Sequence, residues 1–283
     1  MRIVLKLSSG LGNQLFMYAF YRHLESRYGV RPYFDDKYFM DHDNLRKPEL
    51  ALLFPDYPVW RMPFNPAGEH HLKRRLYTWI QRCNPLVKRI SEDAYDDCCR
   101  YQGHTLYFDG YWQTRRYVDK MDKTLLQPKE PMPDILLPWL QKIQQATCAV
   151  SLHVRRGDYF TPRYIGRFGV CHENYYHEAM AYMEQQQGNN VTYFVFSDDP
   201  EWVQQQLTFR QPCVVVDNHD VNSFWYIYLM SHCRHHIISN STFSWWGAYL
   251  NPASDKMVVG PDQWTRDSDS TLMLDEWTKI STL

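Results

Sequence analysis

The sequence lacks the features that mark a membrane protein or a nucleic-acid binder. No apolar run approaches the roughly 20 residues that a bilayer-spanning helix needs. The opening segment, MRIVLKLSSG, is interrupted too early to be a signal peptide. The formal net charge is −1, whereas a nucleic-acid binder usually carries a basic excess. We therefore expect no transmembrane segment and no nucleic-acid partner.

The cysteines do not form a metal or redox motif. There are seven of them, the only close pair is the vicinal Cys98–Cys99, and no C-x-x-C spacing occurs, so a zinc ribbon is not supported. An odd number of scattered cysteines suits a reducing compartment, which indicates a cytoplasmic protein. P-loop, G-x-S-x-G and H-E-x-x-H motifs are absent as well.

Aromatic residues are plentiful, at 16% of the chain, and hydrophobic residues make up 44%. This composition is typical of a globular protein with a substantial core. Aromatic rings often line sugar or nucleotide sites, but they also fill cores, and composition alone does not distinguish the two.

The first half of the chain begins with a strand–turn–helix pattern. An apolar strand is expected at 2–7, a turn at SSGLGN, a helix at 14–28 that stops at Gly29, and a second strand in VRPYFD. Prolines then interrupt the pattern, and only a helix at 72–82 and an extended piece at 105–112 are indicated. The proline-rich run QPKEPMPD at 127–134 predicts a boundary between domains 1–130 and 131–283.

The second half alternates between strands and helices. Apolar runs at 148–154, 191–197, 213–217, 235–239 and 256–260 predict strands, and helical periodicity separates them. Such alternation implies a parallel, doubly wound α/β sheet with right-handed crossovers. Ligands of these sheets bind beyond the carboxyl ends of the strands, so those ends are the candidate sites.

A glycine turn and two arginines stand at such strand ends. In SSGLGNQ, Gly10 and Gly12 permit a tight turn, and the following helix offers free N–H groups to an anion, although a turn that simply needs glycine explains the pattern equally well. In HVRRGD, Arg155 and Arg156 fit a diphosphate, the alternative being an ion pair with Asp158. Ser241 in SNST is able to cap a helix or bind a phosphate with the same geometry.

Metal sites are not predicted. Asp198–Asp199 precede Pro200 and indicate the start of a helix, and Asp267 and Asp269 lie in a polar tail rather than at a strand end. The vicinal pairs His70–His71 and His235–His236 have no partners at metal-ligand spacing, which favours core or surface positions.

Several of these segments together resemble the bacterial α1,2-fucosyltransferases of glycosyltransferase family 11. The resemblance rests on GLGNQLFMYAF, GYWQTRRYV, HVRRGDY, YFVFSDD and YLMSHCRHHIISNSTFSWWGAYLNP, and it covers most of the chain. It implies a GT-B-like α/β fold, with two Rossmann-like domains facing a cleft. Domain 1–130 would be the acceptor side and domain 131–283 the GDP-fucose side.

The resemblance also implies a reaction. L-fucose would pass, with inversion and without a metal or other cofactor, from GDP-β-L-fucose to the 2-hydroxyl of a terminal galactoside. The acceptor would be a free galactoside or a lipid-linked oligosaccharide, the latter placing the enzyme at the inner membrane face. A transferase with another donor or linkage and a noncatalytic glycan-binding protein are the alternatives.

By the same resemblance, residues receive roles. Arg155 would grip the β-phosphate and act with Asp158 as a catalytic residue, while His153 would lie by the guanine or ribose. The remaining donor-binding residues would be Gly12, Asn13, Gln14, Arg156, Ser241 and Thr242.

Two roles stay open. Relatives often carry an aspartate where this chain has Tyr226, so the residue that reads guanine is unassigned, with Asp217 and Asp220 as candidates. The acceptor hydroxyl needs a proton acceptor, for which the candidates are Asp36, Asp109, Asp158 and His172.

Overall fold

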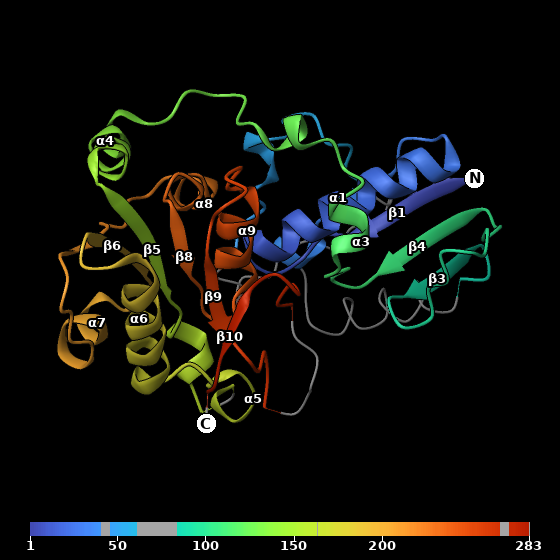
Figure 1. Cartoon of the computed structure of the whole chain (residues 1–283). Helices are drawn as coiled ribbons and strands as arrows, with labels where there is room; N and C mark the ends of the chain where they lie inside the picture. Colours follow the sequence, from blue (N-terminus) through green and yellow to red (C-terminus); the bar gives the residue numbers. More distant parts are fainter. Residues whose placement is uncertain (41–45, 61–83, 163, 267–271, 283) are drawn as a thin grey trace. The chain divides into compact units, whose positions relative to one another are not determined.

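The structure is a computed structural model that describes residues 1–40, 46–60, 84–162, 164–266 and 272–282 (Figure 1). The chain divides into two compact units, Met1–Glu130 and Pro131–Leu283. The division falls in the proline-rich run 127–134. Each unit contains one sheet, and every strand pairing in both sheets is parallel.

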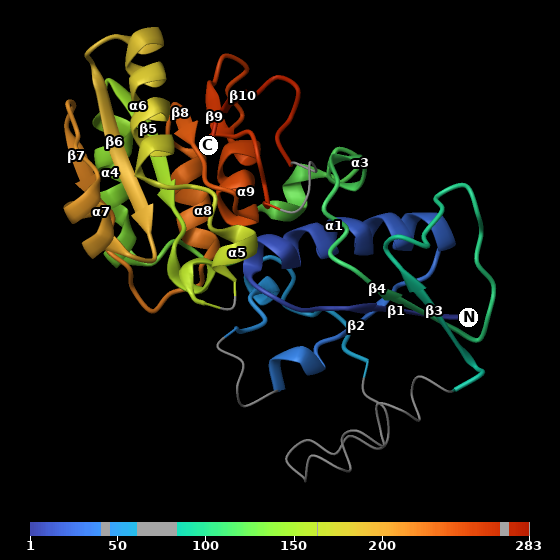
Figure 2. The same ribbon diagram turned by 90° about the horizontal axis from the view of Figure 1, so that it is seen from below.

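The first unit is built on a four-stranded sheet in the order β2-β1-β4-β3. Helix α1 lies along one face of this sheet, next to α3 (Figure 2). The elements of this unit are β1 (Arg2–Lys6), α1 (Leu11–Tyr28), β2 (Tyr33–Asp35), η1 (Lys37–Met40), η2 (Leu50–Leu52), β3 (Val87–Ser91), β4 (Thr105–Asp109), α3 (Arg115–Val118) and η3 (Lys123–Leu126).

Helix α1 begins earlier than the sequence predicts. The predicted turn SSGLGN ends at Gly10, and the helix starts at Leu11 rather than at residue 14. The reason is that Ser9 takes the left-handed conformation (φ 68°), which completes the turn before Gly10. The expected stop at Gly29 is confirmed, since this residue has φ 65°, a conformation that glycine adopts without strain.

The second unit contains a six-stranded sheet in the order β10-β9-β8-β5-β6-β7. Figure 1 shows α6 on one face of this sheet and α8 with α9 on the other. Its elements are η4 (Asp134–Leu136), α4 (Leu137–Gln145), β5 (Cys148–Val154), η5 (Gly157–Phe160), α5 (Ile165–Phe168), α6 (Glu173–Gln187), β6 (Val191–Ser197), α7 (Pro200–Gln206), β7 (Cys213–Val215), α8 (Phe224–Ser231), β8 (His235–Ile237), α9 (Thr242–Leu250), β9 (Val258–Pro261) and β10 (Thr278–Ile280).

Strand β5 is the centre of this sheet. Its Leu152 pairs with Val195 of β6 on one side and with Ile237 of β8 on the other. Because helices cover both faces, the strand is buried almost throughout and is mostly apolar, with Ser151 and His153 as its polar residues. The predicted parallel, doubly wound arrangement is confirmed.

Two strands have no counterpart in the sequence prediction. β3 carries Lys88 and Arg89 in a stretch of five residues, and β10 has only three. Both are edge strands, for which an apolar run is not required. The predicted helix at 72–82 lies outside the described residues.

Candidate active site

The order of strands in the second unit changes direction at β5. The chain runs from β5 to β6 on one side and returns through β8 on the other, so β5 and β8 border the switch point where α/β sheets bind ligands. The segments that follow these two strands are HVRRGD and SNST. A hydrogen bond of 2.8 Å between His153 Nδ1 and Ser239 Oγ joins them. Two motifs far apart in the sequence therefore meet at this switch point.

His153 is a buried, uncharged member of this group. Burial, reinforced by the neighbouring Arg155, lowers its pKa to about 3. The imidazole is therefore neutral near pH 7, with one ring nitrogen as donor and the other as acceptor. It supplies hydrogen bonding to the site rather than positive charge.

Arg155 is held between two carboxylates. Its Nη2 donates to Asp158 Oδ1 at 2.5 Å, and its Nη1 lies 2.6 Å from Asp198 Oδ2. The arginine side chain is only 18% exposed, and its guanidinium also lies 5.3 Å from the ring centre of Tyr159. The ion pair with Asp158, given above as the alternative to a diphosphate site, is present. Asp198 is a partner that sequence reasoning missed.

Asp198 holds the segment 155–157, which follows β5, through both of its carboxylate oxygens. Its Oδ1 accepts the backbone N–H of Arg156 at 2.8 Å, while its Oδ2 faces Arg155. The carboxylate lies against Gly157, where an added Cβ would stand only 2.5 Å from Oδ2. Gly157 is thus a glycine because Asp198 occupies the space of a side chain.

Arg156 has a different environment from Arg155. Its guanidinium lies over the rings of Phe160 and Trp202, at 3.9 and 4.1 Å from the ring centres. Its Nε is 3.4 Å from Asp199, which also caps α7 by accepting the N–H of Trp202. The expected helix start at Asp199–Pro200 is confirmed, and Arg156 packs as part of the loop's support.

The other side of the switch point is the start of α9. Ser241 is its N-cap and accepts the N–H of Phe243 at 3.3 Å, so the capping interpretation of SNST is confirmed. Thr242 is the first helical residue. Asn240 anchors the turn by donating to the carbonyl oxygens of Phe168 and Trp264.

Tyr226 holds the loop after β7. Its hydroxyl accepts the N–H of His219 at 2.6 Å and lies 3.3 Å from the carbonyl oxygen of Asp217. The ring is buried. Tyr226 therefore shapes the segment that contains Asp217 and Asp220, the two residues considered for guanine recognition.

In the first unit, the corresponding switch point lies between β1 and β4. Asn13 donates to Ser9 Oγ at 2.9 Å and accepts the amide N–H of Gln113 at 2.7 Å. Lys6 and Asp109, at the ends of the same two strands, form an ion pair of 2.9 Å. GLGNQ and GYWQTRR thus meet at this edge, and Gln113 joins the candidate residues.

Gln14 has a role other than the predicted one. Its side chain is fully buried and donates to the carbonyl oxygens of Ser9 and Lys47, while its oxygen accepts the N–H of Glu49. Both amide N–H groups are used within the protein, so Gln14 clamps the turn and has no donor left for a ligand. Gly12 lies in the first turn of α1, where the helix begins.

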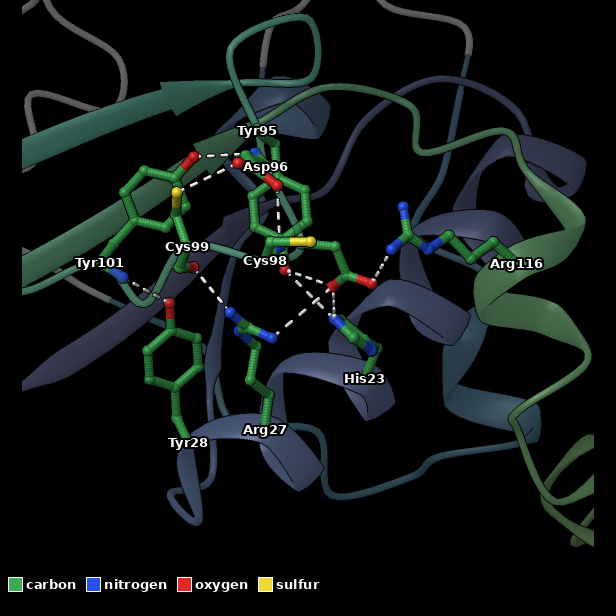
Figure 3. A network of polar contacts seen from close by, with 10 residues as sticks. His23, Arg27, Tyr28, Tyr95, Asp96, Cys98, Cys99, Tyr101 and Arg116 are labelled. Carbon is green, nitrogen blue, oxygen red and sulfur yellow. Dashed lines mark hydrogen bonds and ion pairs between the residues drawn. The ribbon is translucent and has the colours of Figure 1, made fainter.

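Farther along α1, a polar network ties this helix to its neighbours (Figure 3). Asp97 receives His23 Nε2 at 2.8 Å, Arg116 Nη2 at 2.5 Å and the Tyr95 hydroxyl at 3.2 Å. Burial alone would raise the pKa of Asp97, but the facing His23 and Arg116 hold it below its ordinary value. The network fixes α3, and with it the segment that carries Gln113.

The other candidate proton acceptors are placed as follows. Asp109 is paired with Lys6, and Asp36 is buried. His172 accepts from Arg266 at 3.2 Å and packs edge-on against Phe160.

Among the described residues, no three His, Cys, Asp or Glu side chains gather in a way that would hold a metal ion. His235 and His236 are buried core residues, whereas His70, His71, Asp267 and Asp269 lie outside the described residues. None of the helices in the described ranges has both the length and the apolar character that crossing a membrane requires.

Comparison with solved structures gives the fold. The crystal structure of the NodZ alpha-1,6-fucosyltransferase soaked with GDP-fucose superimposes with a TM-score of 0.53, over 89% of this chain and 93% of that one. The sequence identity is 14%, so this likeness establishes the fold alone. With its two parallel sheets, the chain has the GT-B-like α/β fold of that glycosyltransferase.

Sequence comparison gives the family. The model of glycosyl transferase family 11 matches residues 87–281, and the chain belongs to this family. It is 32% identical to the O-antigen biosynthesis glycosyltransferase WbnK of Escherichia coli, over 97% of this chain and 99% of that protein. It is 28% identical to an alpha-1,2-colitosyltransferase of the same species, over 93% and 92% of the two chains.

Proposed function

We propose that the protein transfers L-fucose from GDP-β-L-fucose to the 2-hydroxyl of a terminal galactoside, with inversion to an α1,2 linkage. Support comes from membership of family 11, from the motif resemblance to α1,2-fucosyltransferases, and from a relative whose name carries the same alpha-1,2 linkage. The relative WbnK suggests that the product belongs to an O-antigen.

The observation that carries the proposal is the orientation of Arg155 at the β5–β8 switch point. Its guanidinium is fixed by Asp198 on one side and meets the half-exposed Asp158 on the other. A carboxylate and a phosphate present the same pair of acceptor oxygens to a guanidinium. We infer that the β-phosphate of GDP-fucose displaces Asp158 from Nη2, while Asp198 stays in place.

This exchange gives the two carboxylates different roles. Charge builds on the departing diphosphate as the bond to fucose breaks, and fixed donors that are already oriented stabilise that charge best. Arg155 and the N–H groups at the start of α9, next to Ser241 and Thr242, supply these donors without a metal ion. Asp158, once released, becomes a candidate to accept the proton of the attacking hydroxyl.

The first unit carries candidate sugar-binding groups of its own. Asn13 and Gln113 form a pair of amides at the end of β1, and amides suit hydroxyl groups of a sugar because they both donate and accept. We assign this pair to fucose or to the acceptor galactoside. A lipid-linked acceptor would place the enzyme in the cytoplasm, at the inner face of the membrane.

A donor and acceptor panel tests the proposal. Purified protein is incubated with GDP-L-fucose, GDP-mannose, UDP-galactose or the corresponding colitose nucleotide, each with lactose and other galactosides, and linkages are determined by NMR. We expect transfer from GDP-L-fucose, an α1,2-linked product, and turnover that persists in EDTA. Preference for the colitose nucleotide would move the assignment to the activity named for the second relative, and galactoside binding without GDP release would indicate a lectin.

The two carboxylates are distinguished by Asp198→Asn and Asp158→Asn. We expect Asp198→Asn to raise KM for the donor, because Arg155 loses its fixed orientation. Asp158→Asn should leave donor KM close to wild type and lower kcat. A raised donor KM in Asp158→Asn, with only kcat lowered in Asp198→Asn, would contradict the proposed replacement of Asp158 by the phosphate.

A further inference from the structure

A hollow of about 650 Å³ opens at the edge of the first unit's sheet opposite Asn13 and Asp109. Its lining includes Arg2, Tyr33, Val87 and Thr105, the residues at which β1, β2, β3 and β4 begin. Because the sheet is parallel, the amino ends of all four strands meet here, at the opposite end of β1 from Asn13. The hollow is therefore distinct from the Asn13–Gln113 pair assigned above to a sugar.

The charge of this hollow has one sign. Among its described lining residues are Arg2, Arg31 and His104, and none is acidic. In the described part of the chain, no carboxylate pairs with Arg2. Arg31 donates to the backbone carbonyl of Asp56, which leaves its charge in place. A cationic hollow without carboxylates favours an anion.

The hollow is also apolar where it meets solvent. Val30, Tyr33 and Leu86 line it, and these side chains are 36%, 38% and 56% exposed. Exposed apolar residues are ordinary when they are scattered, but a cluster of them beside cations marks an interaction surface. A small soluble anion would need the cations only, and it would leave the aliphatic side chains in water.

We propose that this edge, defined by Arg2, Val30, Arg31, Tyr33, Leu86 and His104, binds the surface of a bilayer that contains anionic phospholipids. The arginines contact the phosphate groups, and the aliphatic side chains enter the boundary between headgroups and acyl chains, as interfacial segments do. The inference deepens the proposed placement at the membrane face by naming the surface responsible.

The geometry suits a peripheral transferase. A parallel strand of five residues spans about 17 Å, so β1 separates this edge from the Asn13 end of the sheet by that distance. The active edge of the first unit then faces away from the bilayer, toward the sugar portion of a lipid-linked glycan.

The test is sedimentation of the full chain with vesicles of equimolar phosphatidylglycerol and phosphatidylcholine, against phosphatidylcholine alone. We expect at least tenfold stronger binding to the anionic vesicles in 0.05 M salt, falling in 0.5 M salt. Arg2→Gln should lower binding about fivefold, the equivalent of one cation near the surface. Leu86→Asp should lower it roughly tenfold by removing buried apolar area.

Matched controls separate this surface from general effects. Arg210→Gln removes an exposed cation of the second unit, and Ile135→Asp alters a side chain of similar exposure (53%) on η4. Neither should change binding. The proposal would be overturned by equal binding to both vesicle types or by wild-type binding of Leu86→Asp. Complete release from the vesicles by millimolar inorganic phosphate would overturn it as well.

Turnover is measured on a soluble galactoside in parallel. All four variants should keep the wild-type rate, because none of the four residues is among those assigned above to the donor or to the acceptor. If the protein does not bind vesicles but transfers fucose, only the membrane surface is refuted. If it binds vesicles but does not transfer fucose, only the proposed transferase activity is refuted.

Discussion

At the scale of single residues, the central question is how one guanidinium serves both the fold and the reaction. Arg155 binds two carboxylates of different character, because Asp198 is 28% exposed and also accepts the Arg156 N–H, whereas Asp158 is 44% exposed. The more firmly bonded partner sets the direction of the guanidinium, and the more exposed one is exchangeable. Lysine has a single ammonium group and is not able to hold both partners in a fixed plane.

Arg155→Lys should therefore lower kcat by about 10²- to 10³-fold, the range measured when a single transition-state donor is removed. GDP affinity should fall as well, because lysine lacks the bidentate geometry. Steady-state kinetics and calorimetric titration with GDP measure both effects. Arg210→Lys, which changes an exposed arginine elsewhere in the second unit, should behave as wild type. An unaltered kcat would remove Arg155 from the mechanism.

Gly157→Ala provides a second test at this scale. The new methyl group would stand 2.5 Å from Asp198 Oδ2, so the carboxylate must leave Arg155 and the Arg156 amide. We expect donor KM to rise at least tenfold while the melting temperature changes little, since the displaced group is the end of a side chain near the surface.

Gly166→Ala is the matched control for this substitution. A Cβ there would meet nothing within 4 Å, and the substitution lies in the same surface segment. Kinetics and melting temperature should both match the wild type. Equal effects of the two alanines would show that the segment as a whole, and not the Asp198 contact, controls the donor site.

At the scale of elements, α1 links the Asn13 turn to the rest of its unit. Its middle is held by the Asp97 network, which also reaches α3 through Arg116 (Figure 3). The Asp97 side chain is only 8% exposed, and loss of its charge would weaken the hydrogen bonds that the half-buried His23 and Tyr95 share with it.

Asp97→Asn should lower the free energy of unfolding by about 2 kcal/mol, the usual contribution of hydrogen bonds to a charged group. Asp119→Asn is the control, because the Arg115–Asp119 pair on α3 is nearly half exposed at both partners and should contribute no more than about 0.5 kcal/mol. Urea unfolding followed by circular dichroism measures both. A loss below about 1 kcal/mol for Asp97→Asn would mean that the network contributes little to stability.

The elements also differ in how well the sequence predicts them. β5 and β6 are buried on both faces and are mostly apolar over seven residues each, so their pattern identifies them. β3 is short, polar and at an edge. Its strand conformation is stabilised by pairing with β4, which its own sequence pattern does not reveal. The pairing of Asp198 with Arg155 joins residues 43 positions apart, and no local pattern reveals it. The sequence SDDP by itself predicts only the helix cap that Asp199 forms, and not the ion pair of Asp198.

At the scale of the whole molecule, buried histidines shape the response to mild acid: burial lowers the pKa of His23, His153, His235 and His236, and furthest for His153 and His236. His153 and His236 are buried in the second unit, and burial lowers the pKa of each to about 3. Asn251 donates to His236 Nε2, an arrangement that requires this nitrogen to be unprotonated. The unfolded chain binds protons at both histidines near pH 6.5, whereas the folded chain does not.

The contribution of these histidines to the free energy of unfolding should therefore be fully present above about pH 7 and should decline as the pH falls below 6.5. Between pH 7.5 and 5.5 each histidine accounts for about 1.4 kcal/mol, or nearly 3 kcal/mol for both. Carboxylates contribute little over this range, because they titrate lower. Urea midpoints at the two pH values measure the effect, and His236→Asn should remove about half of the difference. A midpoint independent of pH would contradict the buried, neutral state of both residues.

The position of β5 has a consequence for synthesis on the ribosome. This strand pairs early with β6, but its other neighbour, β8, leaves the ribosome about 80 residues later, which is roughly 4 to 16 seconds at ordinary rates of translation. During that interval this mostly apolar strand has one unpaired edge, the kind of edge that neighbouring nascent chains are able to join. Slowing translation between Val154 and His235 should therefore increase aggregation more than slowing it elsewhere in the message.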